Sequence, residues 1–195
     1  MPHTEWRPTR RPGRPPRLSR EQIVAAALEI DLDALTMPAV AARLDVSTQA
    51  LYYWVDNRDE LITLIGDVLV ARIMPSEEPV DGDWRAWLAE LAWGMFHQLL
   101  AVPGFTGRIF ARRQGSSARE QLQARVVATL VAAGLEQQAA TDTWDVFGTS
   151  VLGWLAAHAP GAGAGAPRDI REAERRFWLL LNTLLRGLPA NAPRM

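Results

Sequence analysis

The sequence predicts an all-α protein, in which a three-helix helix-turn-helix head precedes a larger helical-bundle body. Three observations predict this fold. From Leu18 onward apolar residues recur at helical spacing, and no segment alternates apolar and polar residues as a strand does. Two short helical segments, near residues 40 and 50, are separated by a tight turn, as in a helix-turn-helix. The 195 residues are enough for both parts.

The first 17 residues contain five prolines and one glycine, so we expect a disordered arm. Residues 1–20 carry six arginines and one acidic residue, whereas residues 21–75 carry three arginines and nine acidic residues. Basic arms commonly contact nucleic acid, which makes Arg10, Arg11 and Arg14 candidate DNA contacts. The chain has no lysine, so a compositional bias toward arginine remains the alternative.

Each predicted helix of the head begins at a capping residue. Ser19, with Gln22 three positions later, has the pattern of a capping box. Thr36, Ser47 and Asn57 are the expected N-caps of the second, third and fourth helices. The fourth helix ends at Pro75.

A polar linker at 76–82 separates the head from the body. Helices are expected over 83–102, 106–112, 117–133, 136–157 and 169–188, with a glycine-rich loop at 160–167. The predicted division is therefore an arm at 1–17, a DNA-binding head at 18–75 that includes the fourth helix, and a body at 76–195.

A helix-turn-helix lays the N-terminal part of its second helix in the major groove of DNA. Gln49 can pair with adenine, Ala50 can contact a thymine methyl group, and hydroxyls near a helix N-terminus suit phosphate. The alternative for Tyr52 and Tyr53 is that they are core aromatics. The candidate contacts in the head are Thr36, Ser47, Thr48, Gln49, Ala50, Tyr52, Tyr53 and Arg58.

The stretches LSREQIVAAALEI and DALTMPAVAARLDVSTQALYYWVDNRDELI resemble the DNA-binding head of the TetR family. The family pattern is matched in register by Leu51, Tyr52, Val55, Arg58 and Leu61. More weakly, Asp83-Trp84-Arg85 and Leu99-Leu100 before Pro103-Gly104-Phe105 resemble the body of the tetracycline-repressor-type subgroup.

The head departs from the family pattern in three places. The usual glycine between the first two helices is missing, and that connection is short. Asp45 stands where the turn usually has glycine, and Pro38 stands where a base-reading residue often lies. We therefore expect base reading to rest on the third helix, with the arginine arm reaching the adjacent minor groove.

The resemblance implies a homodimer that pairs through the last two helices. The proposed apolar seam is Phe177, Leu181, Leu184 and Leu188. The alternative is that this stripe belongs to the core of a single chain.

The resemblance also implies a small-molecule pocket in the body, where six tryptophans follow residue 83. Ordinary core packing is the alternative for each aromatic side chain. The candidate lining is Trp87, Leu91, Met95, His97, Gln98, Phe110, Trp144, Phe147, Phe177 and Asn182. We expect no cofactor and no metal, because cysteine is absent and the three histidines are isolated.

The sequence thus predicts a dimeric repressor that binds a palindromic operator and is released by a small, largely apolar or aromatic molecule. A DNA-binding regulator without a small-molecule ligand, or one that senses a protein partner, is the alternative. An enzyme is not expected, because no phosphate loop or nucleophile elbow is present. No apolar run reaches membrane-spanning length and no signal peptide is evident, so we expect a cytoplasmic protein.

Overall fold

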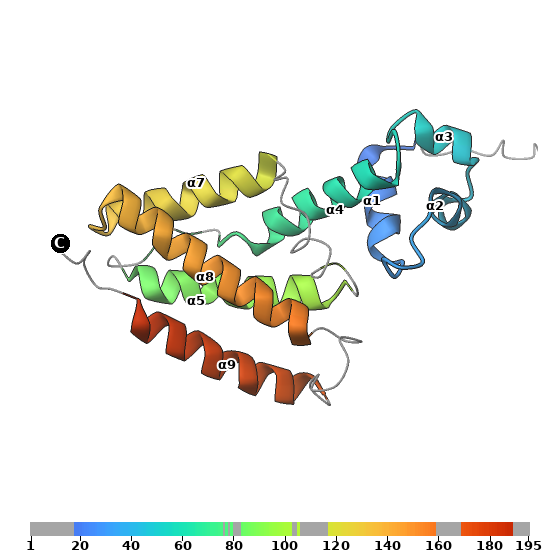
Figure 1. Cartoon of the computed structure of the whole chain (residues 1–195). Helices are drawn as coiled ribbons and strands as arrows, with labels where there is room; N and C mark the ends of the chain where they lie inside the picture. The colour runs from blue at the N-terminus through green and yellow to red at the C-terminus, as the bar shows by residue number, and fades with distance from the viewer. Residues whose placement is uncertain are drawn as a thin grey trace, which may run out of the picture.

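The computed structural model describes residues 18–75, 77, 79, 83–102, 105, 117–158 and 169–188. All regular secondary structure within them is helical, which confirms the all-α prediction. Figure 1 shows α1, α2 and α3 as a compact head at one end, and α4 running from this head into the body. The helices are α1 (Arg20–Leu28), α2 (Met37–Leu44), α3 (Thr48–Tyr52), α4 (Arg58–Ile73), α5 (Trp84–Leu100), α7 (Ser117–Ala132), α8 (Gln137–His158) and α9 (Ile170–Gly187). The arm at 1–17 and the short helix predicted at 106–112 lie outside the described residues.

The four capping residues predicted for the head are confirmed. Ser19 and Gln22 form a reciprocal capping box, in which each side chain accepts a hydrogen bond from the backbone N–H of the other. The side chains of Thr36, Ser47 and Asn57 each accept from the N–H three residues later. The hydrogen bond with Ser19 also lowers the pKa of the exposed Glu21 carboxyl.

The turn between α2 and α3 closes without glycine. Asp45 takes its place in the left-handed region, at φ 52°. The Asp45 N–H donates to the Ala42 carbonyl at 3.3 Å and the Val46 N–H donates to the Ala41 carbonyl at 3.0 Å. These bonds satisfy the last carbonyls of α2, as a C-terminal glycine motif does. A residue with a Cβ atom takes this conformation at a cost of about 1 kcal/mol.

The short connection between α1 and α2 is held by an arginine of α4. Leu32 and Leu35 are buried, and their backbone carbonyls point toward Arg58. The Arg58 guanidinium donates from Nε to Leu35 O at 2.6 Å and from Nη2 to Leu32 O at 2.7 Å. This side chain therefore fixes a loop that has no glycine to shape it.

Helix α4 packs against both parts of the molecule. Its start lies against α1, and its later turns lie against α5 and α7. At the far end the approach is close, because a Cβ atom on Gly94 of α5 would lie 2.9 Å from the carbonyl oxygen of Ile73. The missing side chain at Gly94 lets the end of α4 contact the backbone of α5.

The body is a helical bundle in which α8 crosses in front of α5 and α9 lies below them in the view of Figure 1. Helix α7 ends at Gly134, whose φ of 99° and hydrogen bond to Val131 form the predicted glycine stop. Arg85 of α5 donates to the carbonyls of Leu185 and Leu188 and so caps the end of α9. None of the helices in the described part of the chain is long and apolar enough to cross a membrane.

Aromatic rings join α9 to α5 and α8. The Phe177 ring of α9 lies 4.8 Å from Phe96, 5.0 Å from Trp93 and 5.2 Å from Trp154, measured between ring centroids. Phe177 and Phe96 are fully buried. These contacts make Phe177 part of the core of one chain.

Candidate DNA-binding surface and effector cavity

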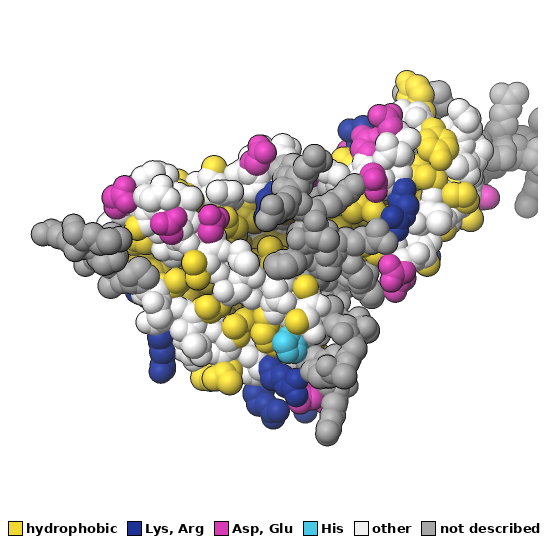
Figure 2. All heavy atoms as spheres, in the orientation of Figure 1, with side chains coloured by type: hydrophobic (Ala, Val, Ile, Leu, Met, Phe, Trp, Pro, Cys, Tyr) yellow, Lys and Arg dark blue, Asp and Glu magenta, His cyan; other side chains and the backbone are white. Residues whose placement is uncertain are grey.

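Helix α3 presents a largely exposed surface at the end of the head. Leu51 is fully buried and anchors the helix, whereas Gln49 is exposed. Tyr52 is 45% exposed and Tyr53 is 84% exposed, so neither is a buried core aromatic. Hydrophobic side chains gather at the tip of the head in Figure 2. The predicted contact residues of α3 therefore lie where a duplex can reach them.

The hydroxyls at the two helix starts already have intramolecular roles. Thr36 is exposed and caps α2, and Ser47 is exposed and caps α3. Thr48 and Ala50 are half-buried beside Ser47. The Thr36 and Ser47 hydroxyls thus each accept a hydrogen bond from a backbone N–H group in the first turn of a helix.

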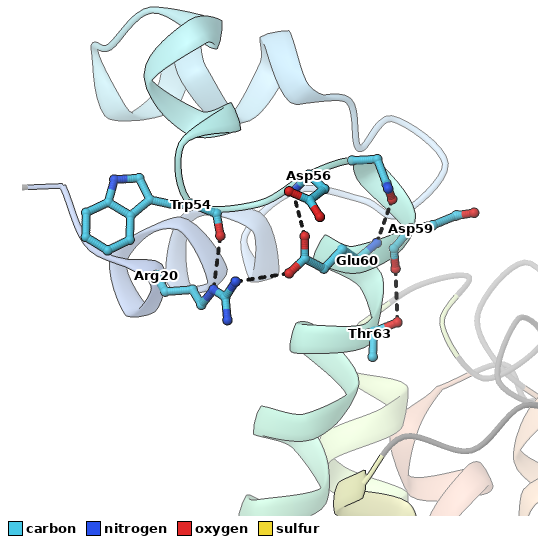
Figure 3. Close-up of polar contacts among 7 residues, drawn as sticks. Arg20, Trp54, Asp56, Asp59, Glu60 and Thr63 are labelled. Carbon is cyan, nitrogen blue, oxygen red and sulfur yellow. Dashed lines mark hydrogen bonds and ion pairs between the residues drawn. The ribbon is translucent and has the colours of Figure 1, made fainter.

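A polar cluster fixes the chain between α3 and α4 (Figure 3). Arg20 of α1 donates to the Trp54 carbonyl and to the Glu60 carboxylate, each at 3.0 Å. The second oxygen of Glu60 accepts from the Asp56 N–H at 2.5 Å. One carboxylate on α4 thus connects α1 with the segment that follows α3.

The described arginines of the head are largely occupied by other parts of the chain. Arg20 binds Glu60 and Trp54, and Arg43 forms an ion pair with Glu29. Arg58, predicted to contact phosphate, is half-buried, and its guanidinium donates two hydrogen bonds to backbone carbonyls. That prediction remains untested, but the observed role of Arg58 is internal. Arg10, Arg11 and Arg14 lie outside the described residues.

A cavity of about 420 Å³ lies in the body between α4, α5, α7 and α8. Its wall is mainly apolar, with the Trp144 indole from α8, and its polar residues come from the start of α4, from α7 and from α8. The apolar residues are Ile62, Gly66, Leu69, Val70, Ile73, Met95, Leu99, Phe105, Leu122, Trp144, Gly148 and Leu152. The polar residues are Asn57, Asp59, Glu60, Thr63, Arg119, Asp145 and Thr149.

The cavity includes Met95 and Trp144 from the predicted lining. It does not touch the other described candidates, which are Trp87, Leu91, His97, Gln98, Phe147, Phe177 and Asn182. Phe110 lies outside the described residues. Trp87, for example, is buried and donates its indole N–H to the Glu77 carbonyl at 2.9 Å. These residues stay untested as ligand contacts, and the reason they do not line this cavity is that helical spacing does not say which apolar side of a helix encloses a cavity.

Sequence reasoning missed the contribution of α4 and α7 to the cavity wall. Gly66 of α4 and Leu122 of α7 are examples. One feature could have indicated α4, since its apolar residues occupy two adjacent sides of the helix. Across the described ranges no three potential metal-ligating side chains lie close enough to hold an ion.

The residues of the predicted dimer seam lie largely inside the single chain. Phe177, Leu181 and Leu188 are buried within one chain, and Leu184 is half-buried against the same core. The seam stays a prediction, and the burial of Phe177, Leu181 and Leu188 fits the alternative that the stripe belongs to the core of one chain.

Other hydrophobic residues of α8 and α9 are exposed. Val146 and Trp178 are each 56% exposed, Leu179 is 63% exposed and Ile170 is 56% exposed. Figure 2 shows hydrophobic side chains over both helices on the viewed face, with basic side chains near the start and end of α9. This face is open in the single chain.

No family model matches the chain. Among curated proteins, 97 residues are 38% identical to the HTH-type transcriptional repressor DrrR1 of Streptomyces coeruleorubidus, covering 45% of this chain and 34% of that protein. The chain is also 27% identical over 162 residues to an HTH-type transcriptional repressor of Mycobacterium tuberculosis, and the match covers 76% of this chain and 62% of that protein. The chain thus spans between about a third and three fifths of the curated relatives it matches.

Solved structures with the same architecture are TetR-family regulators. The TetR family protein ActR of Streptomyces coelicolor, in complex with actinorhodin, superimposes with a TM-score of 0.71 at 24% identity, over 88% of this chain and 95% of ActR. A variant of TetR from Acinetobacter baumannii, in complex with minocycline, superimposes with a TM-score of 0.70 at 25% identity, over 87% of this chain and 96% of that protein. The chain therefore has the fold of a helix-turn-helix head on a helical body.

Proposed function

We propose that this chain is a cytoplasmic homodimeric repressor. It has the fold of TetR-family regulators, and it would dissociate from its operator when a small molecule binds in the cavity of the body. The observation that carries the proposal is that one helix serves both sites. Helix α4 supplies much of the cavity wall. Its first turn also holds the head, because Glu60 binds the segment that follows α3 and Arg58 binds the connection between α1 and α2. A molecule in the cavity therefore acts on the element that positions the head.

The DNA-binding residues follow from exposure and chemistry. Gln49 would read a base edge, while Tyr52 and Tyr53 would bind phosphates beside it. Two such heads in a dimer would bind half-sites one helical turn apart, which implies a palindromic operator. The arginine arm would add charge, because Arg20, Arg43 and Arg58 are bonded within the chain.

The effector follows from the cavity. Its wall offers a broad apolar surface and one indole, with polar residues from α4, α7 and α8. A largely apolar or aromatic molecule with a few polar substituents suits such a site. Two structures with this fold hold actinorhodin and minocycline, which makes these compounds reasonable first probes. The effector would shift the population between two head spacings only if it binds one of them more tightly.

The proposal is tested in two steps with the purified full chain. Selection from a random duplex library should enrich an inverted repeat; enrichment of no sequence would contradict operator binding. Thermal unfolding should then be followed with actinorhodin and with minocycline at several concentrations. A compound that raises Tm and releases the selected operator supports the effector site. A compound that raises Tm without releasing DNA would contradict the coupling through α4.

A further inference from the structure

We propose that the cavity between α4, α5, α7 and α8 selects planar aromatic molecules that carry a positive charge at one end. The aromatic part would lie against the Trp144 indole in the apolar interior, and the cationic end would lie beside the Asp145 carboxylate at the opening. The inference rests on the effector cavity of the proposed function and names the class of molecule that this cavity takes.

The polar and apolar residues of the cavity wall differ in their exposure to solvent. Every described apolar residue of the wall is buried or half-buried. The polar residues other than Glu60 are all exposed, and we call them the mouth: Asn57, Asp59, Thr63, Arg119, Asp145 and Thr149. Such a cavity suits a molecule that is apolar along most of its length and polar where it meets water.

Helix α8 places an acidic group next to the aromatic part of the wall. Asp145 and Thr149 are four positions apart, so they share one side of the helix at the mouth. Trp144, Gly148 and Leu152 repeat the same spacing one position earlier or later, and all three line the interior. The carboxylate and the indole therefore come from adjacent stripes of one helix. A single ligand of moderate length can contact both.

The Trp144 indole lies along α8 as a flat part of the wall. A Cβ atom on Gly148 would be 3.5 Å from the indole atoms Cη2 and Cζ2, so the ring occupies the space beside this glycine. Gly66 of α4 has the same relation to a second ring, because its Cβ atom would be 3.5 Å from Cζ of Phe105. Planar aromatic molecules stack on such rings, and the face of an indole attracts cations more strongly than other aromatic side chains do.

The charged residues of the wall leave an excess of negative charge. Asp59, Glu60 and Asp145 are acidic, whereas Arg119 is the basic residue among the described lining. Glu60 is compensated by Arg20, which lies 3.0 Å from it. On the viewed face of the body, acidic side chains also lie over α7 and α8 (Figure 2). The potential at the mouth therefore favours a cation over an anion.

Asp145 is the acidic residue best placed to meet the cation. Within the described part of the chain its carboxylate forms no hydrogen bond and no ion pair. A ligand cation at this position would gain the attraction of the carboxylate without displacing an internal partner. An anionic ligand at the same position would be repelled.

Three probes with one tricyclic ring system test the charge preference. At pH 7.5, 9-aminoacridine is a cation, acridine is neutral and acridine-9-carboxylate is an anion. Isothermal titration calorimetry with the full chain, without DNA, measures their affinities. The cation should bind about tenfold more tightly than the anion, with the neutral ring between them, because the exposed carboxylate attracts one and repels the other. High salt should reduce this difference.

Substitutions on α8 assign the preference to named residues. Asp145→Asn should weaken binding of 9-aminoacridine about fivefold and leave acridine unchanged, since only the cation loses an ionic contact. Trp144→Leu should weaken binding of all three probes, because each would stack on the indole. The matched control is Asp142→Asn, an exposed acidic residue on the same helix that does not line the cavity. It should leave every affinity unchanged. Circular dichroism of each variant confirms that the fold is kept.

Three results would overturn the inference. If the probes bind equally well, or the anion binds most tightly, the charge preference is wrong while the cavity still binds aromatic molecules. If the cation is preferred but Asp145→Asn has no more effect than Asp142→Asn, Asp145 does not hold the cationic end. If no probe binds or raises Tm, the cavity does not take planar aromatic molecules, and the effector site of the proposed function fails with it. Selection of an operator without any probe tests the DNA-binding part separately.

Discussion

Arg20 and Glu60 form an ion pair across 40 positions of sequence, with Arg20 Nη2 3.0 Å from Glu60 Oε1. The pair joins the first turn of α1 to the first turn of α4 (Figure 3). Because Glu60 also accepts from the Asp56 N–H, its carboxylate is the point where α1, α4 and the segment after α3 are held together. The position of α3 relative to α1 and α4 therefore depends on this carboxylate and its two partners.

A double-mutant cycle should measure this pair. Arg20→Met removes the bonds to both Glu60 and Trp54 and should lower the free energy of unfolding by about 1–1.5 kcal/mol. Glu60→Gln keeps an acceptor for the Asp56 N–H and should cost less, about 0.5–1 kcal/mol. The coupling should be about 0.5 kcal/mol in urea unfolding and should shrink at high salt. A coupling of zero at low salt would contradict a contribution of the pair.

Gly94 and Gly187 offer a matched pair of glycine substitutions. Gly94→Ala places a Cβ atom 2.9 Å from the Ile73 carbonyl oxygen and should destabilise the fold by about 1–3 kcal/mol. Gly187 is also helical, but a Cβ atom there would meet nothing within 4 Å, so Gly187→Ala should stabilise by about 0.5 kcal/mol. Thermal unfolding compares the two. Equal effects would show that the contact between α4 and α5 tolerates a methyl group.

Gln49→Ala should weaken binding to the selected operator by about 1–3 kcal/mol while leaving binding to random duplex nearly unchanged. The reason is that the exposed amide would read a base edge rather than a phosphate. Fluorescence anisotropy at one salt concentration measures both affinities. Gln138→Ala, an exposed glutamine on α8, is the control. Equal losses on the two duplexes would remove Gln49 from base reading.

Deletion of residues 1–17 should flatten the dependence of operator affinity on salt. Each arginine that neutralises a phosphate contributes about one unit to the slope of log affinity against log salt. Arg20, Arg43 and Arg58 are already bonded within the chain, which leaves the arm to supply most of the charge. Titrations at several salt concentrations give the slope. An unchanged slope would mean that the arm makes no phosphate contact.

Local structure was predictable from the sequence, because helix ends depend on a few neighbouring residues. Ser19, Thr36, Ser47 and Asn57 cap the helices as their residue types indicate, and Gly134 ends α7. These motifs satisfy free backbone groups within one turn and need no tertiary information. The all-α fold followed from the same local patterns.

The tertiary contacts of individual side chains were not predictable in the same way. An apolar stripe on α9 predicts that this side of the helix is buried but not which element buries it. In the structure Phe177 packs against α5 and α8 of its own chain. Trp144 reaches the cavity, but Trp87 lies elsewhere in the core. Arg58 fits a family pattern in sequence, yet its bonds to Leu32 and Leu35 depend on a loop 23 and 26 positions away.

The tryptophans lie in different parts of the molecule, so their intrinsic fluorescence can report on each part. Trp54 lies in the head, Trp144 in the cavity wall and Trp178 on the open face of α9, whereas Trp93 and Trp154 pack around Phe177. Indole emission depends on its surroundings, so single-tryptophan variants would separate DNA contact, effector entry, assembly and unfolding by wavelength and intensity. No external dye would be needed to follow the four events in one protein.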